Sequence, residues 1–207
     1  MTPLLPITHY SLPITKSKSE IRKQVLAQRD ALTPAERRAL SERITPRLLA
    51  LQSCRAARCV MAYVSFGSEF ETAGFISGLL AKGRKLVLPR AERGSRALKL
   101  YEVRDLEREL AAGVWGIREP RPELCPEAAP EEIELVLVPG VAFTPRCDRL
   151  GYGGGFYDRL IRAFAKRPAL VAAAFSLQLV PELPISESDQ RVDLVLTEDA
   201  EYGAGRS

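Results

Sequence analysis

The chain has 207 residues, of which 46% are hydrophobic and 27% are charged, as in an ordinary soluble globular domain; this composition excludes disorder over most of the chain. Its net charge of +4 comes from basic residues scattered among acidic ones, which argues against a nucleic-acid-binding stripe and favours small polyanions as ligands. The one histidine, His9, offers no positioned base for a Ser-His-Asp or Cys-His mechanism.

Cysteine spacing and hydrophobic segments bear on where the protein works. The four cysteines, Cys54, Cys59, Cys125 and Cys147, show no Cys-x-x-Cys spacing, so we expect no structural zinc site and reduced thiols, as is usual inside cells. No apolar stretch reaches the length of a signal-peptide core or a membrane span. We expect a cytoplasmic monomer that binds small molecules and has no membrane or nucleic-acid partner.

Two helices are predicted in the first quarter of the chain. Ser17 and Glu20 form a Ser-x-x-Glu capping box, which marks the start of the first helix. Thr33 and Glu36 repeat this signal around a proline at the first helical position, and apolar residues follow at helical spacing. We expect Pro46 to kink or interrupt this second helix.

Short apolar runs then alternate with helical patterns. Strands are predicted at residues 59–64, 85–89, 98–103, 134–138, 169–175 and 192–197, with helices ending at Gly83 and spanning 105–112 and 156–165. This alternation indicates a three-layer α/β/α fold with a mostly parallel, possibly mixed, central sheet. We expect a single domain over residues 16–200, a flexible extension over 1–15 and a tail over 201–207.

Ligand sites in such sheets form beyond the carboxyl ends of the strands, and three loops qualify: 65–72, 139–155 and 176–191. The second contains four glycines between residues 151 and 155, just before a helix, which is typical of a backbone cradle for phosphate. It matches neither a P-loop nor Gly-x-Gly-x-x-Gly, since Phe156 takes the third glycine position. A turn that merely needs glycine is the alternative, but the flanking Arg149 and Asp158 are suited to clamping phosphate and holding Mg²⁺.

The segment 138–143, followed by residues 149–159, resembles the signature of 5-formyltetrahydrofolate cyclo-ligases, also called methenyltetrahydrofolate synthetases. The likeness extends from about Lys18 to Glu198. It implies a NagB/RpiA/CoA-transferase-like fold and an ATP- and Mg²⁺-dependent ligase of one-carbon folate metabolism. The implied reaction converts 5-formyltetrahydrofolate into 5,10-methenyltetrahydrofolate through a phosphorylated formyl intermediate, with release of ADP and phosphate.

The resemblance also implies roles for individual residues, with Arg149 as the catalytic one. The implied ATP-binding residues are Lys18, Arg22, Arg149, Leu150, Gly151, Tyr152, Gly153, Gly154, Gly155, Phe156 and Tyr157. The implied substrate-binding residues are Phe66, Glu71, Tyr152, Gly153, Gly154, Gly155 and Phe156. The implied metal ligands are Asp158 and Asp189, with Asp193 as a weaker candidate. On residue type alone, Lys18 and Arg22 also suit a solvated helix face, Glu71 a helix start, and Asp189 a loop cap.

The chain departs from the family at residues 144–148, where Thr-Pro-Arg-Cys-Asp replaces the usual Phe-Asp and glycine-bearing turn. Two alternative hypotheses stay open, and this departure supports the first of them. One is a non-catalytic relative that still binds folate or ATP, and the other is an ATP-dependent enzyme that acts on another N-formyl or amide substrate.

Overall fold

The computed structural model describes residues 16–92, 94–95, 97–113 and 116–203, so the expected extension over 1–15 and the last four residues of the expected tail lie outside the described residues. The helices are α1 (Lys18–Asp30), α2 (Pro34–Ala50), α3 (Gln52–Ala56), α4 (Ala73–Ala81), α5 (Leu106–Glu109) and α6 (Phe156–Ala163), with short 3₁₀ helices η2 (Pro130–Glu132) and η3 (Ser176–Gln178). The strands of the main sheet are β1 (Cys59–Met61), β2 (Lys85–Ala91), β3 (Leu98–Val103), β6 (Leu135–Leu137), β9 (Ala169–Ala173), β10 (Leu194–Leu196) and β11 (Glu201–Gly203). Two small hairpins pair β4 (Leu110–Ala112) with β5 (Arg118–Pro120) and β7 (Ala142–Phe143) with β8 (Arg149–Leu150).

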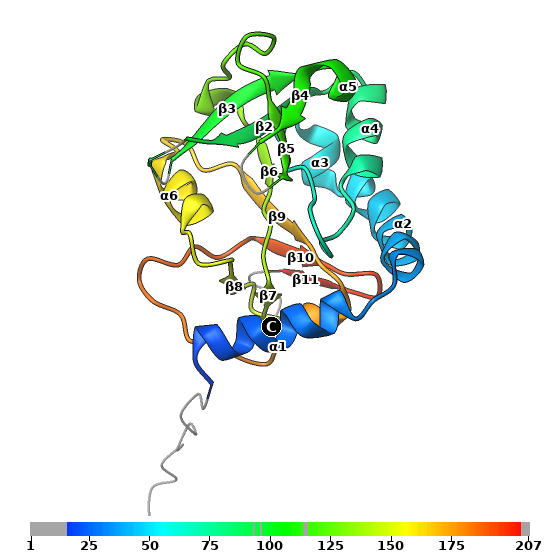
Figure 1. Cartoon of the computed structure of the whole chain (residues 1–207), viewed down its shortest axis with the longest axis vertical. Coiled ribbons are helices and arrows are strands. Elements are labelled where there is room, and N and C mark those ends of the chain that lie inside the picture. Colours follow the sequence, from blue (N-terminus) through cyan, green and yellow to red (C-terminus); the bar gives the residue numbers. More distant parts are fainter. Residues whose placement is uncertain (1–15, 93, 96, 114–115, 204–207) are drawn as a thin grey trace, which may run out of the picture.

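The main sheet has the strand order β11-β10-β9-β6-β1-β2-β3 (Figure 1). Its five central strands run parallel to one another, while β3 pairs antiparallel with β2 at one edge and β11 with β10 at the other. The predicted mostly parallel, mixed sheet is therefore confirmed. Strands β1 and β6 are buried along their whole length, which explains why they read as unbroken apolar runs in the sequence.

Helices cover both faces of the sheet, which confirms the predicted three layers. Figure 1 shows α2, α3 and α4 on one side and α6 on the other. On the first side, Ile44, Leu48 and Phe75 pack against the sheet and are fully buried. On the second side, Ile161 and Phe164 pack with Phe143 from β7.

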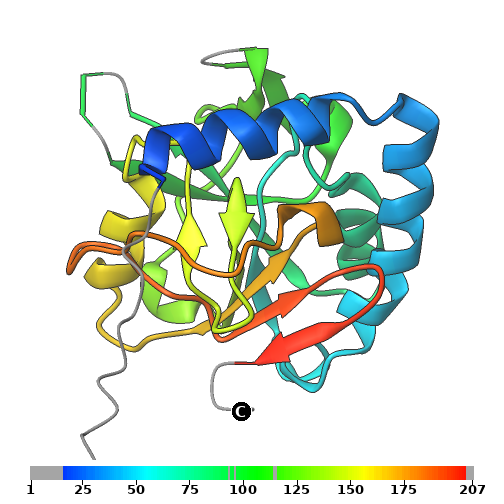
Figure 2. The same cartoon turned by 90° about the horizontal axis from the view of Figure 1, so that it is seen from below.

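Helix α1 lies across the carboxyl end of the sheet rather than on a face (Figure 2). It packs against β7 and η3, and its buried Ile21 and Val25 form a separate apolar cluster with Val141 and Leu150. Both predicted capping boxes are present, at Ser17 for α1 and at Thr33 for α2. The start of each helix was thus readable from the sequence, whereas the place of α1 was not.

The second predicted helix is not interrupted at Pro46, because α2 continues to Ala50. Pro46 removes one backbone hydrogen bond, but Ile44 and Leu48 on either side of it are fully buried and hold both turns against the sheet. In the same turn, the Thr45 hydroxyl donates to the Ser41 carbonyl at 2.8 Å. Burial outweighs the missing bond here.

Two further segments differ from the sequence prediction. The expected helix over 105–112 ends at Glu109, and its last three residues form β4, where Leu110 is buried and pairs with Pro120. Residues 201–203, expected in the tail, form β11 and pair with β10, Val195 facing Tyr202. In both places a non-local strand partner decides the conformation. In the described part of the chain, no helix has the length and apolar character needed to cross a membrane.

Candidate active site

A cavity of about 680 Å³ lies at the carboxyl end of the sheet, beside α1 and the start of α6. All three loops singled out in the sequence contribute to it, through Phe66, Arg149 and Asp189. Its lining includes every site residue expected from the sequence except Glu71 and the weaker metal candidate Asp193. Segments that lie more than a hundred residues apart in the chain therefore meet around one space.

The glycine loop needs glycine for steric reasons. Gly153 and Gly155 have φ of 105° and 66°, in the left-handed region that other residues rarely adopt. A Cβ on Gly154 would lie 2.7 Å from Cδ2 of the Phe156 ring. Gly155 is the N-cap of α6, so the loop leads directly into a helix N-terminus, which favours anions.

Helix α1 brings two basic residues to this loop. Lys18 and Arg22 are four residues apart, so they share one helical face. The Arg22 Nε donates to the Gly151 carbonyl at 2.7 Å, and the Lys18 Nζ lies 2.5 Å from the Asp189 Oδ2. The pair therefore joins α1 to the glycine loop and to the loop before β10.

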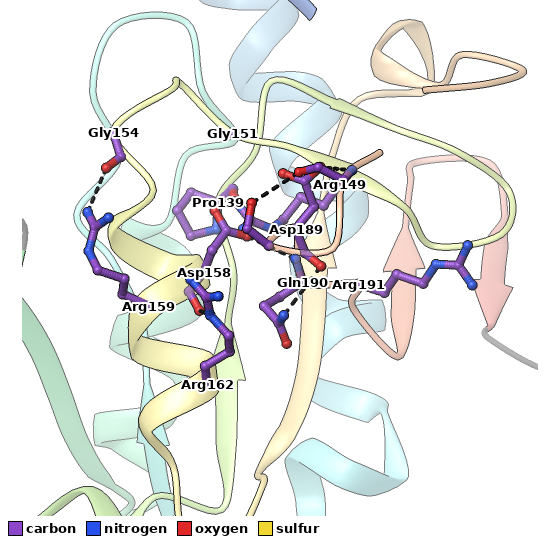
Figure 3. Close-up of polar contacts among 12 residues, drawn as sticks. Pro139, Arg149, Gly151, Gly154, Asp158, Arg159, Arg162, Asp189, Gln190 and Arg191 are labelled. Atoms are coloured by element: carbon purple, nitrogen blue, oxygen red, sulfur yellow. Dashed lines mark hydrogen bonds and ion pairs between the residues drawn. The ribbon is translucent and has the colours of Figure 1, made fainter. Parts of the chain in front are cut away.

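Arg149 lies under the glycine loop with its side chain only 3% exposed (Figure 3). Its Nη1 donates to the Pro139 carbonyl at 3.2 Å, and its Nη2 lies 2.5 Å from the Asp158 Oδ1. The Gln190 N–H donates to that same carboxylate oxygen at 3.0 Å. The expected phosphate clamp and one expected metal ligand are thus each other's partners.

The cavity lining also includes an acidic residue and two aromatic residues, Glu69, Phe66 and Tyr152. The Arg29 Nη2 donates to the Tyr152 hydroxyl at 2.7 Å, and this hydroxyl donates to the Glu69 Oε1 at 2.8 Å. Glu69 is 4% exposed, and burial raises the pKa of its carboxyl, although hydrogen bonds from Tyr152 and the Phe66 N–H oppose the rise. The exposed rings of Phe66 and Tyr152 lie 5.4 Å apart, centroid to centroid.

Glu71, the expected substrate ligand, does not line the cavity; Glu69 does. The loop is closed by reciprocal bonds, with the Ser65 N–H donating to the Thr72 Oγ1 at 3.0 Å and the Thr72 N–H to the Ser65 Oγ at 3.2 Å. The Glu71 N–H donates at 3.0 Å to the Ser41 hydroxyl on α2, which draws this part of the loop away from the cavity. Chain spacing alone did not separate the two glutamates.

Other lining residues were missed from the sequence. Arg159 donates to the Gly154 carbonyl at 2.7 Å, and its guanidinium lies 5.8 Å from the centroid of the Phe156 ring. Arg162 also lines the cavity. The signal was present, since the two arginines are three residues apart on the helix that follows the glycine loop. Together they add positive charge where an anion is expected.

The two aspartates expected to hold Mg²⁺ both line the cavity, and the Asp158 carboxylate is bonded to the backbone of the residue after Asp189. Within the described residues no three His, Cys, Asp or Glu side chains are placed to hold a metal ion by themselves. Mg²⁺ commonly binds one or two carboxylates together with substrate phosphates, so these two residues fit it in the presence of a nucleotide. Asp193 is outside the lining and instead accepts the Leu170 N–H at 2.8 Å and pairs with Arg167.

The divergent turn at 144–148 also lies outside the lining. Cys147 has a φ of 65°, a conformation that glycine adopts more easily, and its side chain is fully buried. Asp148 accepts the Thr144 hydroxyl at 2.9 Å and pairs with the Arg191 Nε at 2.5 Å. This ion pair ties the turn to the loop that carries Asp189.

The fold and cavity define an α/β protein with a cavity lined by arginines and a glycine-rich loop at the carboxyl end of a mostly parallel sheet. The model of the 5-formyltetrahydrofolate cyclo-ligase family matches residues 14–198, and the chain belongs to this family. It is 32% identical over 184 residues to the 5-formyltetrahydrofolate cyclo-ligase of Mycolicibacterium smegmatis, covering 88% of this chain and 94% of that one. It is 29% identical over 194 residues to the probable enzyme of Caenorhabditis elegans, covering 89% and 94%.

Solved structures of 5,10-methenyltetrahydrofolate synthetases also resemble this chain. The 5,10-methenyltetrahydrofolate synthetase of Aquifex aeolicus superposes with a TM-score of 0.79 at 33% identity, covering 92% of this chain and 94% of that chain. The synthetase of Mycoplasma pneumoniae, at 22% identity and a TM-score of 0.72, has the same fold.

Proposed function

We propose that the protein is a 5-formyltetrahydrofolate cyclo-ligase, which uses ATP to convert 5-formyltetrahydrofolate into 5,10-methenyltetrahydrofolate and releases ADP and phosphate. The observation that carries the proposal is that two groups of residues line the same cavity: Arg149 with the glycine loop, and Glu69 with Phe66. The first group suits phosphate, and the second suits a flat ring that carries hydrogen-bond donors. Family membership supports the same reaction.

The chemistry requires activation of a poor leaving group. The formyl oxygen attacks the γ-phosphorus of ATP, and the bond from phosphorus to the ADP oxygen breaks. N10 of the folate then bonds to the activated formyl carbon, the carbon–oxygen bond breaks with departure of phosphate, and the N10 proton is released. The protein's contribution to both steps is positioning and charge neutralisation.

Neutralisation falls to the basic side of the cavity. The proposed ATP ligands are Lys18 and Arg22 of α1 together with Arg149 and residues 150–157. Arg149 is the proposed catalytic residue, because its buried guanidinium already lies at the base of the loop and its planar fork of donors matches phosphate. When ATP binds, the Arg149 guanidinium would donate to a phosphate oxygen in place of the Asp158 carboxylate.

The folate side is formed by Phe66, Tyr152 and Glu69. The two rings offer apolar surface to the pterin or benzoate, with the small residues of the glycine loop beside them. We assign to Glu69 the contact with the polar edge of the pterin that the sequence had assigned to Glu71, since a carboxylate accepts from ring N–H groups.

Asp158 and Asp189 are the residues proposed to hold Mg²⁺. When bound together with ATP, the ion neutralises phosphate charge. Each carboxylate now pairs with a cation, Asp158 with Arg149 and Asp189 with Lys18, so each already compensates a positive charge.

An absorbance assay tests the function directly. Purified protein with 5-formyltetrahydrofolate and MgATP should generate the near-ultraviolet absorbance of the methenyl product with equal formation of ADP. ATP consumption without that absorbance would indicate another substrate. No ATP consumption would indicate a non-catalytic binding protein.

We also propose that the protein acts in the cytoplasm as a monomer. The Arabidopsis thaliana cyclo-ligase is named as mitochondrial, so the location of this protein needs its own test. Cell fractionation and light scattering of the purified protein test these two points separately.

A further inference from the structure

Three buried side-chain nitrogen or oxygen atoms lack a hydrogen-bond partner within the described residues: Nη1 of Arg29, Nε of Arg149 and the hydroxyl oxygen of Tyr157. Two of these residues, Arg149 and Tyr157, line the candidate active site. Buried polar groups are nearly always hydrogen-bonded in folded proteins, so such an atom at a cavity wall points to a partner that arrives with a ligand.

Tyr157 lines the cavity at the start of the helix that follows the glycine loop. It is in the first turn of α6, and its ring packs against the apolar cluster beneath that helix. Burial raises the pKa of its hydroxyl, the nearby Glu69 carboxylate adds to the rise, and the Arg149 guanidinium opposes it. The hydroxyl thus lies within electrostatic reach of both the phosphate side and the folate side, and at neutral pH it keeps its proton.

On the basis of the proposed function, we propose that the Tyr157 hydroxyl is a catalytic hydrogen-bond donor to the phosphoryl group as it passes from ATP to the formyl oxygen. In that transfer the formyl oxygen bonds to phosphorus and the bond to ADP breaks. In the next step N10 bonds to carbon, and the carbon–oxygen electron pair leaves with phosphate. A fixed neutral donor stabilises the negative charge that develops on phosphate oxygens in both steps.

The Tyr157→Phe variant tests this role, because it removes one oxygen and keeps the ring. We expect kcat to fall at least tenfold, while KM for 5-formyltetrahydrofolate stays within about twofold. Since the hydroxyl has no partner in the ligand-free protein, the melting temperature without ligands should be unchanged or higher. Tyr202→Phe on β11, outside the cavity lining, is the matched control and should retain wild-type kcat.

The outcomes separate this role from the proposed function. If wild-type protein forms no methenyl product, the proposed function fails. If wild-type protein is active and Tyr157→Phe turns over within twofold of it, the role of Tyr157 is refuted. A clearly lower melting temperature of the ligand-free variant would also refute it, because the hydroxyl would then have a partner inside the protein.

Discussion

The Arg149 Nη2 and the Asp158 Oδ1 lie 2.5 Å apart, nine residues from one another in the chain and beneath the glycine loop. The arginine side chain is 3% exposed and the aspartate side chain 18%. A charge buried this deeply needs a partner, so each residue compensates the charge of the other and holds it in place. In the proposed reaction, the arginine would pair with phosphate of the bound ATP, and the carboxylate would be free to hold Mg²⁺.

Arg149→Ala should reduce turnover by on the order of 10²-fold or more, as loss of a transition-state charge partner does. The methenyl absorbance assay measures it, with the melting temperature checking that the protein is folded. Arg149→Lys keeps the charge but loses the two-pronged donor geometry. Its turnover should therefore lie between those of the wild type and Arg149→Ala. Near-normal turnover of the alanine variant would remove Arg149 from the mechanism.

Asp158→Asn should raise the Mg²⁺ concentration needed for half-maximal activity, because one proposed ligand loses its charge. Asp193→Asn is the control, since Asp193 lies outside the cavity lining and bonds the backbone of Leu170. That control should lower stability without shifting the Mg²⁺ titration. If the Mg²⁺ titration of Asp158→Asn matches that of the wild type, Asp158 is not a metal ligand and its role is limited to pairing with Arg149.

Arg29→Met should loosen the wall of the cavity that holds Glu69. Arg29 is 2% exposed and donates to the Ser68 and Tyr152 hydroxyls at 2.9 and 2.7 Å. Loss of these charged hydrogen bonds should lower the free energy of unfolding by about 2–3 kcal/mol and raise KM for the folate. Denaturant titration and steady-state kinetics measure the two effects. The exposed Arg38 on α2 gives a control, Arg38→Met, in which the free energy of unfolding and KM for the folate should both stay at their wild-type values. Equal effects in the two variants would contradict the prediction.

Glu69 should make stability depend on pH. Its folded-state pKa is raised by burial above the ordinary 4.5, so the folded protein holds this proton more tightly than the unfolded chain does. The contribution to stability is therefore full below pH 4.5 and is lost as pH rises through the folded pKa. Glu69→Gln should lack this loss.

Unfolding free energies of wild type and Glu69→Gln, measured from about pH 4 to pH 8, check this point. The wild type should lose stability relative to the variant as pH rises above 4.5. A difference between the two proteins that stays constant with pH would show that burial does not hold a proton on Glu69.

The candidate site was largely readable from the sequence because its central part is local. Four glycines before a helix, with Arg149 and Asp158 at either end, predict a phosphate-binding loop from only ten consecutive residues. The pairing of Arg149 with Asp158 was not readable, because it depends on the β7–β8 hairpin and the first turn of α6 meeting at one point. The choice between Glu69 and Glu71 likewise depended on a bond from the loop to Ser41 of α2.

The sequence by itself determined the helix starts at Ser17 and Thr33, the buried parallel strands and the glycine loop, because capping, apolar periodicity and backbone freedom act between near neighbours. Only the tertiary structure decided that α2 runs through Pro46, that residues 110–112 and 201–203 become strands, and that Glu69 rather than Glu71 lines the cavity. Each of these depends on a partner far along the chain, and burial or strand pairing with that partner outweighs the local preference.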